Sequence, residues 1–195
     1  MVSSMAEIRS FIAVELPDEV KLALTKLQDR LKSGSRTPAK WVDPSSIHLT
    51  LKFLGNISEG MVGRLMAALS EAARGTAPLH LELKGLGAFP NPKNVRVVWV
   101  GTTGDVDKLI RLQQAVESGL KPLGFNPEPR PFTPHLTLAR LREEATPAAR
   151  QQLGQLITTT GFETTGFLVD AIHLMRSQLT REGAIYSRLG SVPLK

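Results

Sequence analysis

Residues 47–51 read Ile-His-Leu-Thr-Leu, and residues 134–138 read Pro-His-Leu-Thr-Leu. Their histidines, His48 and His135, are 87 residues apart in a chain of 195, so each half of the chain carries one copy. Both copies are short, apolar and rich in residues that strands accept, which predicts a β-strand at each. The repeat therefore indicates a molecule built from two similar halves.

The order of polar and apolar residues in each copy predicts which side chains share a face. Successive side chains on a strand point to opposite sides of the sheet. His48 and Thr50 should therefore share one face, and Leu49, Leu51 and Phe53 the other. The second copy follows the same pattern, so each strand should bury its leucines and present a His-Thr pair to a cleft.

The pairing of histidine with threonine indicates acid–base chemistry at phosphorus. Histidine has an unperturbed pKa of about 6.5, so two histidines can give and take a proton in one turnover at neutral pH. A threonine hydroxyl can donate a hydrogen bond to a phosphoryl oxygen. We therefore interpret His48, Thr50, His135 and Thr137 as a cradle for in-line displacement at phosphorus, with no metal and no cofactor.

Two other interpretations of the repeat are weaker. A single His-Leu-Thr-Leu strand would usually be a packing feature, but the chain has only four histidines, and two of them stand in the same tetrapeptide. A zinc site is less attractive, because neither motif holds an acidic residue and two histidines leave the metal short of ligands. The other histidines, His80 and His173, have no threonine two positions later, so we expect them to be structural or at the surface.

Composition sets the class of protein. A chain of 195 residues with 42% hydrophobic and 22% charged residues suits one domain or two small lobes around an apolar core. The absence of cysteine excludes disulfides, thiolate metal sites and a cysteine nucleophile. The net charge of +6 and the pI of about 9.9 favour a polyanionic partner such as nucleic acid, although many soluble proteins are equally basic.

Several targeting and binding signals are missing from the sequence. No apolar run approaches the roughly 20 residues of a membrane span, and neither a dinucleotide-binding fingerprint nor a phosphate-binding P-loop is present. The first residues lack the pattern of a signal peptide, so we expect a cytoplasmic protein, with Met1 or Met5 as its start.

Periodicity along the rest of the chain predicts a mixed α+β fold with helices packed on antiparallel sheets. Four prolines make residues 124–134 an extended loop. Strands are expected over residues 8–14, 47–54, 79–89, 95–100, 135–141, 162–175 and 184–192, and helices over residues 18–34, 58–75, 105–120 and 147–160.

The two motifs and their flanks resemble the two-histidine (2H) phosphoesterases, in particular the LigT-like RNA 2′,3′-cyclic phosphodiesterases first described as 2′-5′ RNA ligases. The hallmark of that family is a pair of His-x-Thr-x motifs, which residues 48–51 and 135–138 match. The similarity covers nearly the whole chain. Further segments that resemble the family are residues 9–17, 41–55, 87–101, 132–140 and 177–186.

This resemblance implies a bilobal α+β fold with pseudo-twofold symmetry, in which residues 1–195 form a single domain with one motif in each lobe. It also implies hydrolysis of RNA 2′,3′-cyclic phosphate ends to 2′-phosphomonoesters, with small cyclic nucleotides as further possible substrates. His48 would be the proton donor and His135 the proton acceptor, while Thr50 and Thr137 would hold the non-bridging oxygens. We expect a monomer.

Four more residues are candidates for substrate binding. Arg140 follows the second motif, but strict alternation puts it on the leucine face, so it reaches the cleft only if the strand bulges or ends first. Lys52 shares the parity of His48 and is either a phosphate contact or a solvated lysine at a strand end. Trp41 and Phe89 are candidates for stacking on an RNA base or for packing in the core. Trp99, in an apolar strand, is expected in the core.

Two alternatives remain open for the function. The same residues could run the chemistry in reverse, as a ligase that joins a 2′,3′-cyclic phosphate to a 5′-hydroxyl. The chain could also be a non-catalytic RNA-binding module that retains the fold, although intact histidines and threonines in both motifs argue against that.

Overall fold

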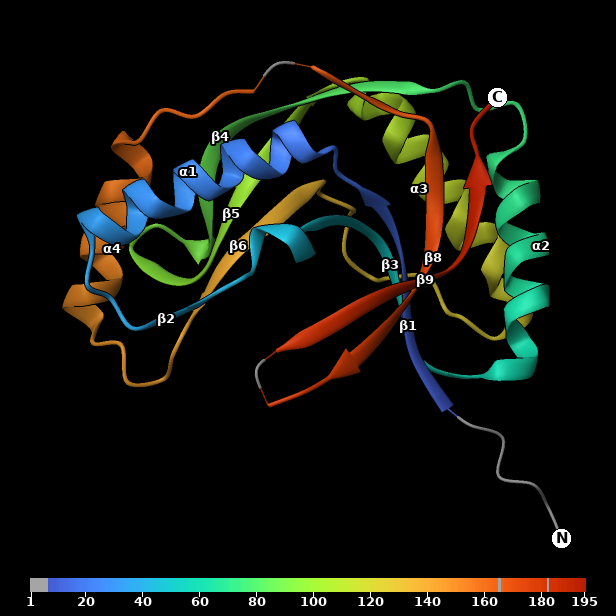
Figure 1. Ribbon diagram of the computed structural model, residues 1–195, viewed down its shortest axis with the longest axis horizontal. Coiled ribbons are helices and arrows are strands. Elements are labelled where there is room, and N and C mark those ends of the chain that lie inside the picture. The colour runs from blue at the N-terminus through green and yellow to red at the C-terminus, as the bar shows by residue number, and fades with distance from the viewer. Residues whose placement is uncertain (1–6, 165, 182) are drawn as a thin grey trace, which may run out of the picture.

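The computed structural model describes residues 7–164, 166–181 and 183–195, and it consists of two antiparallel sheets with helices packed on them (Figure 1). Met1 and Met5, the two candidate starts, lie outside the described residues. Sheet A has the order β3-β1-β8-β9 and comprises β3 (His48–Ser58), β1 (Glu7–Glu15), β8 (Ala171–Leu179) and β9 (Ala184–Pro193). Sheet B has the order β2-β6-β5-β4-β7 and comprises β2 (Ala39–Trp41), β6 (His135–Leu141), β5 (Asn94–Gly104), β4 (Leu79–Asn91) and β7 (Phe167–Val169).

The helices are divided between the two sheets. The long helices are α1 (Asp18–Gly34), α2 (Val62–Ala73), α3 (Val106–Leu120) and α4 (Pro147–Thr159), and the 3₁₀ turns are Pro44–Ser46, Glu59–Met61 and Lys121–Leu123. Helices α1 and α4 lie over sheet B, and α2 and α3 lie beside sheet A (Figure 1). Helix α1 follows a strand of sheet A yet lies over sheet B, where its Gln28 reaches Leu138 (Figure 1). Helix α3 follows a strand of sheet B yet packs beside α2 and is bonded to β3 of sheet A through Gln113 and Glu117. The expected bilobal α+β fold is confirmed.

The helices form where the sequence provides an apolar face and a suitable first residue. Helix α4 begins as predicted: the Thr146 hydroxyl accepts a hydrogen bond from the Ala149 amide at 3.2 Å, and Pro147 occupies the first helical position. Each fully buried leucine contributes about 1.5–3 kcal/mol through loss of apolar surface from water. Helix α1 buries Val20, Leu24, Leu27, Gln28 and Leu31, and of these only Gln28 is polar.

One strand prediction is wrong, and one short strand was not expected. Residues 162–175 do not form a single strand, because the chain leaves sheet B after Val169 and enters sheet A at Ala171. Asp170 lies at that crossing. The segment after α1 also contains the three-residue strand β2, which adds an edge to sheet B. Within the described residues, no helix has the length and apolar character to cross a membrane.

A β-bulge follows the threonine of each motif. The β1–β3 ladder passes from Thr50 to Lys52 and leaves Leu51 without a partner. The β5–β6 ladder leaves Leu138 without a partner in the same way. A bulge of one residue breaks the alternation of side chains, so residues beyond it change face.

Strict alternation therefore gives the wrong faces beyond both threonines. Phe53, expected with the buried leucines, is 63% exposed, and Lys52, expected in the cleft with His48, is only 3% exposed. In the second motif the same irregularity buries Ala139 and brings Arg140 to the cleft, the one condition under which alternation allowed it to arrive there.

Candidate active site

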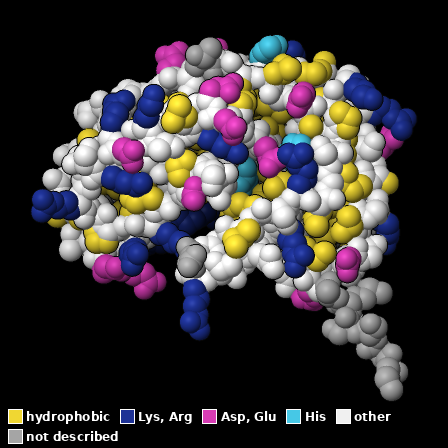
Figure 2. Space-filling view, viewed as in Figure 1, with side chains coloured by type: hydrophobic (Ala, Val, Ile, Leu, Met, Phe, Trp, Pro, Cys, Tyr) yellow, Lys and Arg dark blue, Asp and Glu magenta, His cyan; other side chains and the backbone are white. Residues whose placement is uncertain are grey.

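Both motifs open into one cleft between the sheets. The cleft has a volume of about 900 Å³, and its lining includes His48, Thr50, His135 and Thr137. Histidine side chains are visible near the middle of the face drawn in Figure 2, with both basic and acidic side chains around them. The two copies of the repeat lie on strands of different sheets, β3 and β6, and their His-Thr pairs line the same cleft.

The two motif histidines are held by the same kind of hydrogen bond, from Nδ1 to the carbonyl oxygen two residues earlier in the chain. His48 Nδ1 is 2.8 Å from the Ser46 carbonyl oxygen, and His135 Nδ1 is 2.6 Å from the Thr133 carbonyl oxygen. A carbonyl oxygen only accepts, so in both rings Nδ1 carries the proton and donates. The other ring nitrogen, Nε2, is then unprotonated in the neutral ring and can take a proton, and it can donate one only in the imidazolium form.

Aromatic side chains fix the plane of each imidazole. Phe11 stacks on His48 with ring centroids 4.5 Å apart, and Tyr186 meets the same ring edge-on at 4.9 Å. In the other half, Phe89 meets His135 edge-on, with centroids 5.0 Å apart. These contacts, together with the Nδ1 hydrogen bonds, leave each ring few orientations.

Burial and a neighbouring carboxylate act on His48 in opposite directions. Burial lowers the pKa of His48, because removal from water disfavours the charged ring, whereas the hydrogen bond to the Ser46 carbonyl and the charge of Glu15 raise it. Glu15 is the Cα partner of His48 in the β1–β3 ladder. Its carboxylate also contacts Arg188 and lies 3.6 Å from His173 Nε2.

The four further candidates fall in different places. Arg140 and Phe89 line the cleft. Trp41 is not among the residues that line it; its ring packs against the core, with Lys32 Nζ 5.5 Å from the ring centroid. Lys52 borders the cleft but turns toward α3, because the bulge reverses its direction.

The ammonium group of Lys52 is already engaged within the protein. Its Nζ is 2.6 Å from Glu117 Oε2 and 2.9 Å from the Asn126 carbonyl oxygen. Lys52 therefore joins the first motif strand to α3 and to the proline-rich loop, instead of offering a free charge beside His48. The expectation of a shared face with His48 is corrected accordingly.

The sequence did not single out four residues that surround the histidines. His48 is contacted by the rings of Phe11 and Tyr186 and pairs across the β1–β3 ladder with Glu15. The fourth residue is Trp99, which was expected in the core; it is half-buried, and its ring centroid is 6.2 Å from that of His135. Their positions depend on strand pairing across the sheets, which a search for motifs does not see. The histidines outside the motifs lie as expected: His80 is exposed on β4 and His173 is buried on β8.

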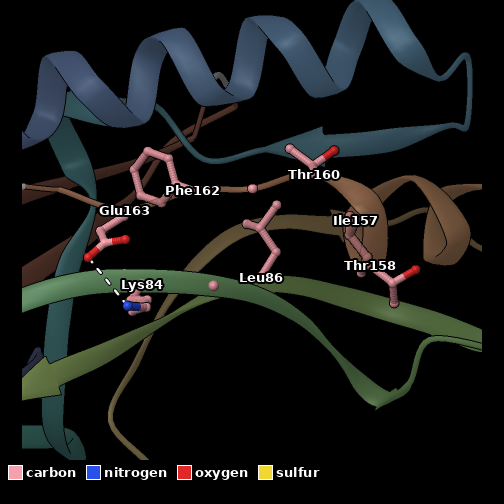
Figure 3. A pocket seen from close by; sticks show the side chains of 9 residues that line it. Lys84, Leu86, Ile157, Thr158, Thr160, Phe162 and Glu163 are labelled. Carbon is pink, nitrogen blue, oxygen red and sulfur yellow. Dashed lines mark hydrogen bonds and ion pairs between the residues drawn. The ribbon is translucent and has the colours of Figure 1, made fainter.

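A second hollow, of about 560 Å³, lies between β4 and the segment that follows α4 (Figure 3). Leu86 and Phe162 line it, and Lys84 Nζ is 3.3 Å from Glu163 Oε1 at its edge. It contains neither motif. In the described part of the chain, no three histidine, cysteine or acidic side chains group closely enough to hold a metal ion.

Comparisons with known proteins agree on one family. Residues 16–181 match the model of the 2′-5′ RNA ligase superfamily. The chain is 35% identical over 182 residues to the RNA 2′,3′-cyclic phosphodiesterase of Methanothermobacter thermautotrophicus, covering 93% of this chain and 96% of that protein. It is 38% identical over 170 residues to the RNA 2′,3′-cyclic phosphodiesterase of Aeropyrum pernix, covering 87% and 93%.

Solved structures share the same architecture. The crystal structure of TT0787 of Thermus thermophilus superimposes with a TM-score of 0.77 at 30% identity, covering 96% of this chain and 98% of that one. E. coli LigT complexed with 3′-AMP gives a TM-score of 0.76 at 24% identity, covering 97% and 99%, a similarity of fold.

Proposed function

The chain belongs to the 2′-5′ RNA ligase superfamily, and from that premise we propose that it hydrolyses RNA 2′,3′-cyclic phosphate ends to 2′-phosphomonoesters with two histidines and no metal ion. The observation that carries the proposal is the matched pair of imidazoles in one cleft, each with Nδ1 bound to a carbonyl and Nε2 left for chemistry. Curated relatives that the chain matches along most of its length are named RNA 2′,3′-cyclic phosphodiesterase, which supports the choice of substrate.

The reaction balances with the groups present. The oxygen of a water molecule bonds to phosphorus while Nε2 of neutral His135 takes its proton. The bond from phosphorus to O3′ breaks, and O3′ takes a proton from Nε2 of the His48 imidazolium. Thr50 and Thr137 donate to the non-bridging oxygens, and the Arg140 guanidinium offsets the charge that develops on them. Each positioned proton transfer is worth about 10²–10⁴-fold in rate.

The roles of proton donor and proton acceptor could be assigned to the two histidines the other way round. The resemblance to the family makes His48 the donor, but burial lowers the pKa of His48 and so favours its neutral form. A bound phosphodiester anion and Glu15 both act to restore the proton on His48. In the reverse arrangement His48 accepts and His135 donates; the lowered pKa of His48 is the observation in its favour.

We propose further that the protein acts on RNA ends as a monomer, since one chain supplies both motifs to the cleft. Small nucleoside 2′,3′-cyclic phosphates present the same reactive group and are further candidate substrates. Because the same residues serve both directions, joining of a cyclic phosphate end to a 5′-hydroxyl is the second candidate activity, and dilute RNA ends in water favour hydrolysis.

The test is turnover of a short RNA with a 2′,3′-cyclic phosphate end, in EDTA. Wild type, His48→Ala and His135→Ala are compared, with His80→Ala as the matched control because His80 is exposed and lies outside the cleft. We expect a 2′-phosphate product from wild type and from His80→Ala, and a loss of about 10²-fold or more in each motif variant.

Three outcomes would contradict parts of the proposal. A folded wild type with no turnover overturns the hydrolase. A 3′-phosphate product overturns the choice of O3′ as leaving group. Activity that EDTA abolishes and zinc restores overturns the metal-free cradle. Adding an RNA with a 5′-hydroxyl to the same reaction measures the joining activity directly.

A further inference from the structure

Two buried glutamines contact equivalent atoms in the two halves of the molecule. Gln28 of α1 is 1% exposed, and its Nε2 is 3.3 Å from the carbonyl oxygen of Leu138. Gln113 of α3 is 5% exposed, and its Nε2 is 3.4 Å from the carbonyl oxygen of Leu51. Leu51 and Leu138 are the fourth residues of the two motifs, so both glutamines reach the same point of the repeat.

That point is the bulge in each motif strand. Leu51 and Leu138 are the residues that the neighbouring ladders skip. A bulge reorients the peptide that follows it and decides which face the next side chains take. The threonine of each motif stands immediately before the bulge, and Arg140 reaches the cleft only because of it.

Each glutamine amide also makes one further hydrogen bond. Gln28 Nε2 is 2.7 Å from the Val42 carbonyl oxygen, which links the segment after β2 to β6. Gln113 Nε2 is 3.1 Å from Glu117 Oε1, and Glu117 in turn holds Lys52, the residue after the first bulge. The two amides thus connect each motif strand to the helix that covers its sheet.

Stability alone does not explain the choice of glutamine at position 28. The other residues that α1 buries are aliphatic, and Gln28 Oε1 has no hydrogen-bond partner within the described residues. A buried polar atom without a partner is unfavourable. The Leu138 carbonyl also accepts from the Val42 amide at 2.9 Å, so it does not need Gln28 for satisfaction.

We propose that Gln28 and Gln113 are positioning residues that fix the two bulges and thereby aim the His-Thr pairs and Arg140 into the cleft. The inference rests on the proposed function, because turnover is its main readout. Gln28 does not line the cleft; Gln113 does, but its amide is engaged by the Leu51 carbonyl oxygen and by Glu117. Both glutamines act through the strand backbone, where a displacement of about 1 Å can cost about 10²-fold in rate.

The test compares Gln28→Met, which keeps the volume and removes the donor, with Leu27→Met as the matched control. Leu27 is the buried neighbour of Gln28 on α1, and an exchange of leucine for methionine is well tolerated in cores. We expect Gln28→Met to lower kcat by about 10- to 100-fold, with KM changed far less and Tm within a few degrees of wild type. Leu27→Met should keep the wild-type kcat.

Gln28→Glu adds a readout that a merely structural role would not move. A protonated carboxyl can donate to the Leu138 carbonyl, whereas a carboxylate can only accept. The activity of Gln28→Glu relative to wild type should therefore fall as the pH rises, and Gln28→Met should show no such trend. Gln113→Met tests the equivalent contact in sheet A, with the same expected loss of kcat.

The outcomes separate this inference from the proposed function. A Gln28→Met variant with kcat within twofold of wild type, or with a loss matched by unfolding, overturns the positioning role while the hydrolase stands. If wild type itself shows no turnover, binding of inorganic phosphate is measured instead. Severalfold weaker phosphate binding by Gln28→Met than by Leu27→Met would sustain the positioning role, and equal binding would overturn it.

Discussion

Phe53 and Arg140 occupy the same place in the two halves of the chain: each stands five residues after the histidine of its motif and lines the cleft beyond a bulge. The halves are therefore alike in backbone and different in chemistry at this position. One side of the cleft presents an exposed aromatic ring, and the other presents a guanidinium group. At this position the positive charge stands on the side of the second motif, and Arg9 and Arg130 also line the cleft.

Arg140→Ala should lower kcat/KM by about 10- to 100-fold, because a charge-assisted hydrogen bond is worth about 1.5–3 kcal/mol. Arg140→Lys should recover only part of this loss, since an ammonium lacks the planar fork of a guanidinium. Arg142→Ala is the matched control: Arg142 is exposed two residues later and does not line the cleft. Steady-state kinetics that give the same values for the Arg140 and Arg142 variants would contradict a role for Arg140 at the phosphate.

Glu15→Gln should lower the pKa of His48 further, because the carboxylate that raises it is removed while burial still lowers it. NMR titration of the His48 ring measures this shift directly. Glu19→Gln, on the exposed first turn of α1, should leave the titration of His48 unchanged. An unchanged His48 titration in Glu15→Gln would show that the carboxylate does not act on the ring.

The same variant distinguishes the two orders of acid and base. If His48 donates, it must be protonated, so a lower pKa moves the alkaline limb of the kcat/KM profile to lower pH. If His48 accepts, it must be neutral, so the acid limb moves to lower pH instead. The wild-type profile should be bell-shaped, and a rate that rises steadily from about pH 5 to 9 would be incompatible with either order.

Lys52→Met should destabilise the protein by about 3–5 kcal/mol, because it leaves Glu117 as a buried charge without its partner. The double variant Lys52→Met, Glu117→Leu should recover most of that loss, since it removes both charges. Urea unfolding of the two variants measures the difference. Equal stability of the single and double variants would mean that the ion pair is not what holds α3 to the first motif strand.

Gly87→Ala should reduce activity without contact to the substrate. A Cβ at residue 87 would overlap Cζ2 of Trp99, so the indole must move, and Phe89 and His135 lie beside it. Loss of kcat should accompany a change in tryptophan fluorescence. Gly63→Ala, where a Cβ meets nothing within 4 Å, is the control and should change neither. A shifted emission with full activity would separate Trp99 from the orientation of His135.

Much of the fold and the centre of the site could be predicted because the signals are local. The helix at Thr146 begins as its cap and proline indicate, and the repeat of His-Leu-Thr-Leu predicts two strands that meet at one cleft. Each of these signals spans only a few neighbouring residues. The α+β class, the two antiparallel sheets and the family are confirmed.

The wrongly predicted side-chain positions depend on contacts between segments that are far apart in the sequence. The bulge after Thr50 is set in the pairing with β1, and Gln113, 62 residues from Leu51, contacts it. Alternation alone therefore put Lys52 and Phe53 on the wrong faces. Trp41 was a stacking candidate because it is aromatic, but packing against the core places it elsewhere. The pairing of Glu15 with His48 likewise depends on the register of two strands.

The chain passes between sheet A and sheet B at several points, among them the connections from β1 to α1, from β5 to α3 and from β7 to β8. A hinge needs a few residues about which two rigid bodies can swing, and here several separate connections would have to bend together. We therefore expect the cleft to keep its width through the catalytic cycle. An RNA terminus would then enter a cleft that does not widen or close around it. Entry would depend on the flexibility of the RNA end more than on closure of the enzyme.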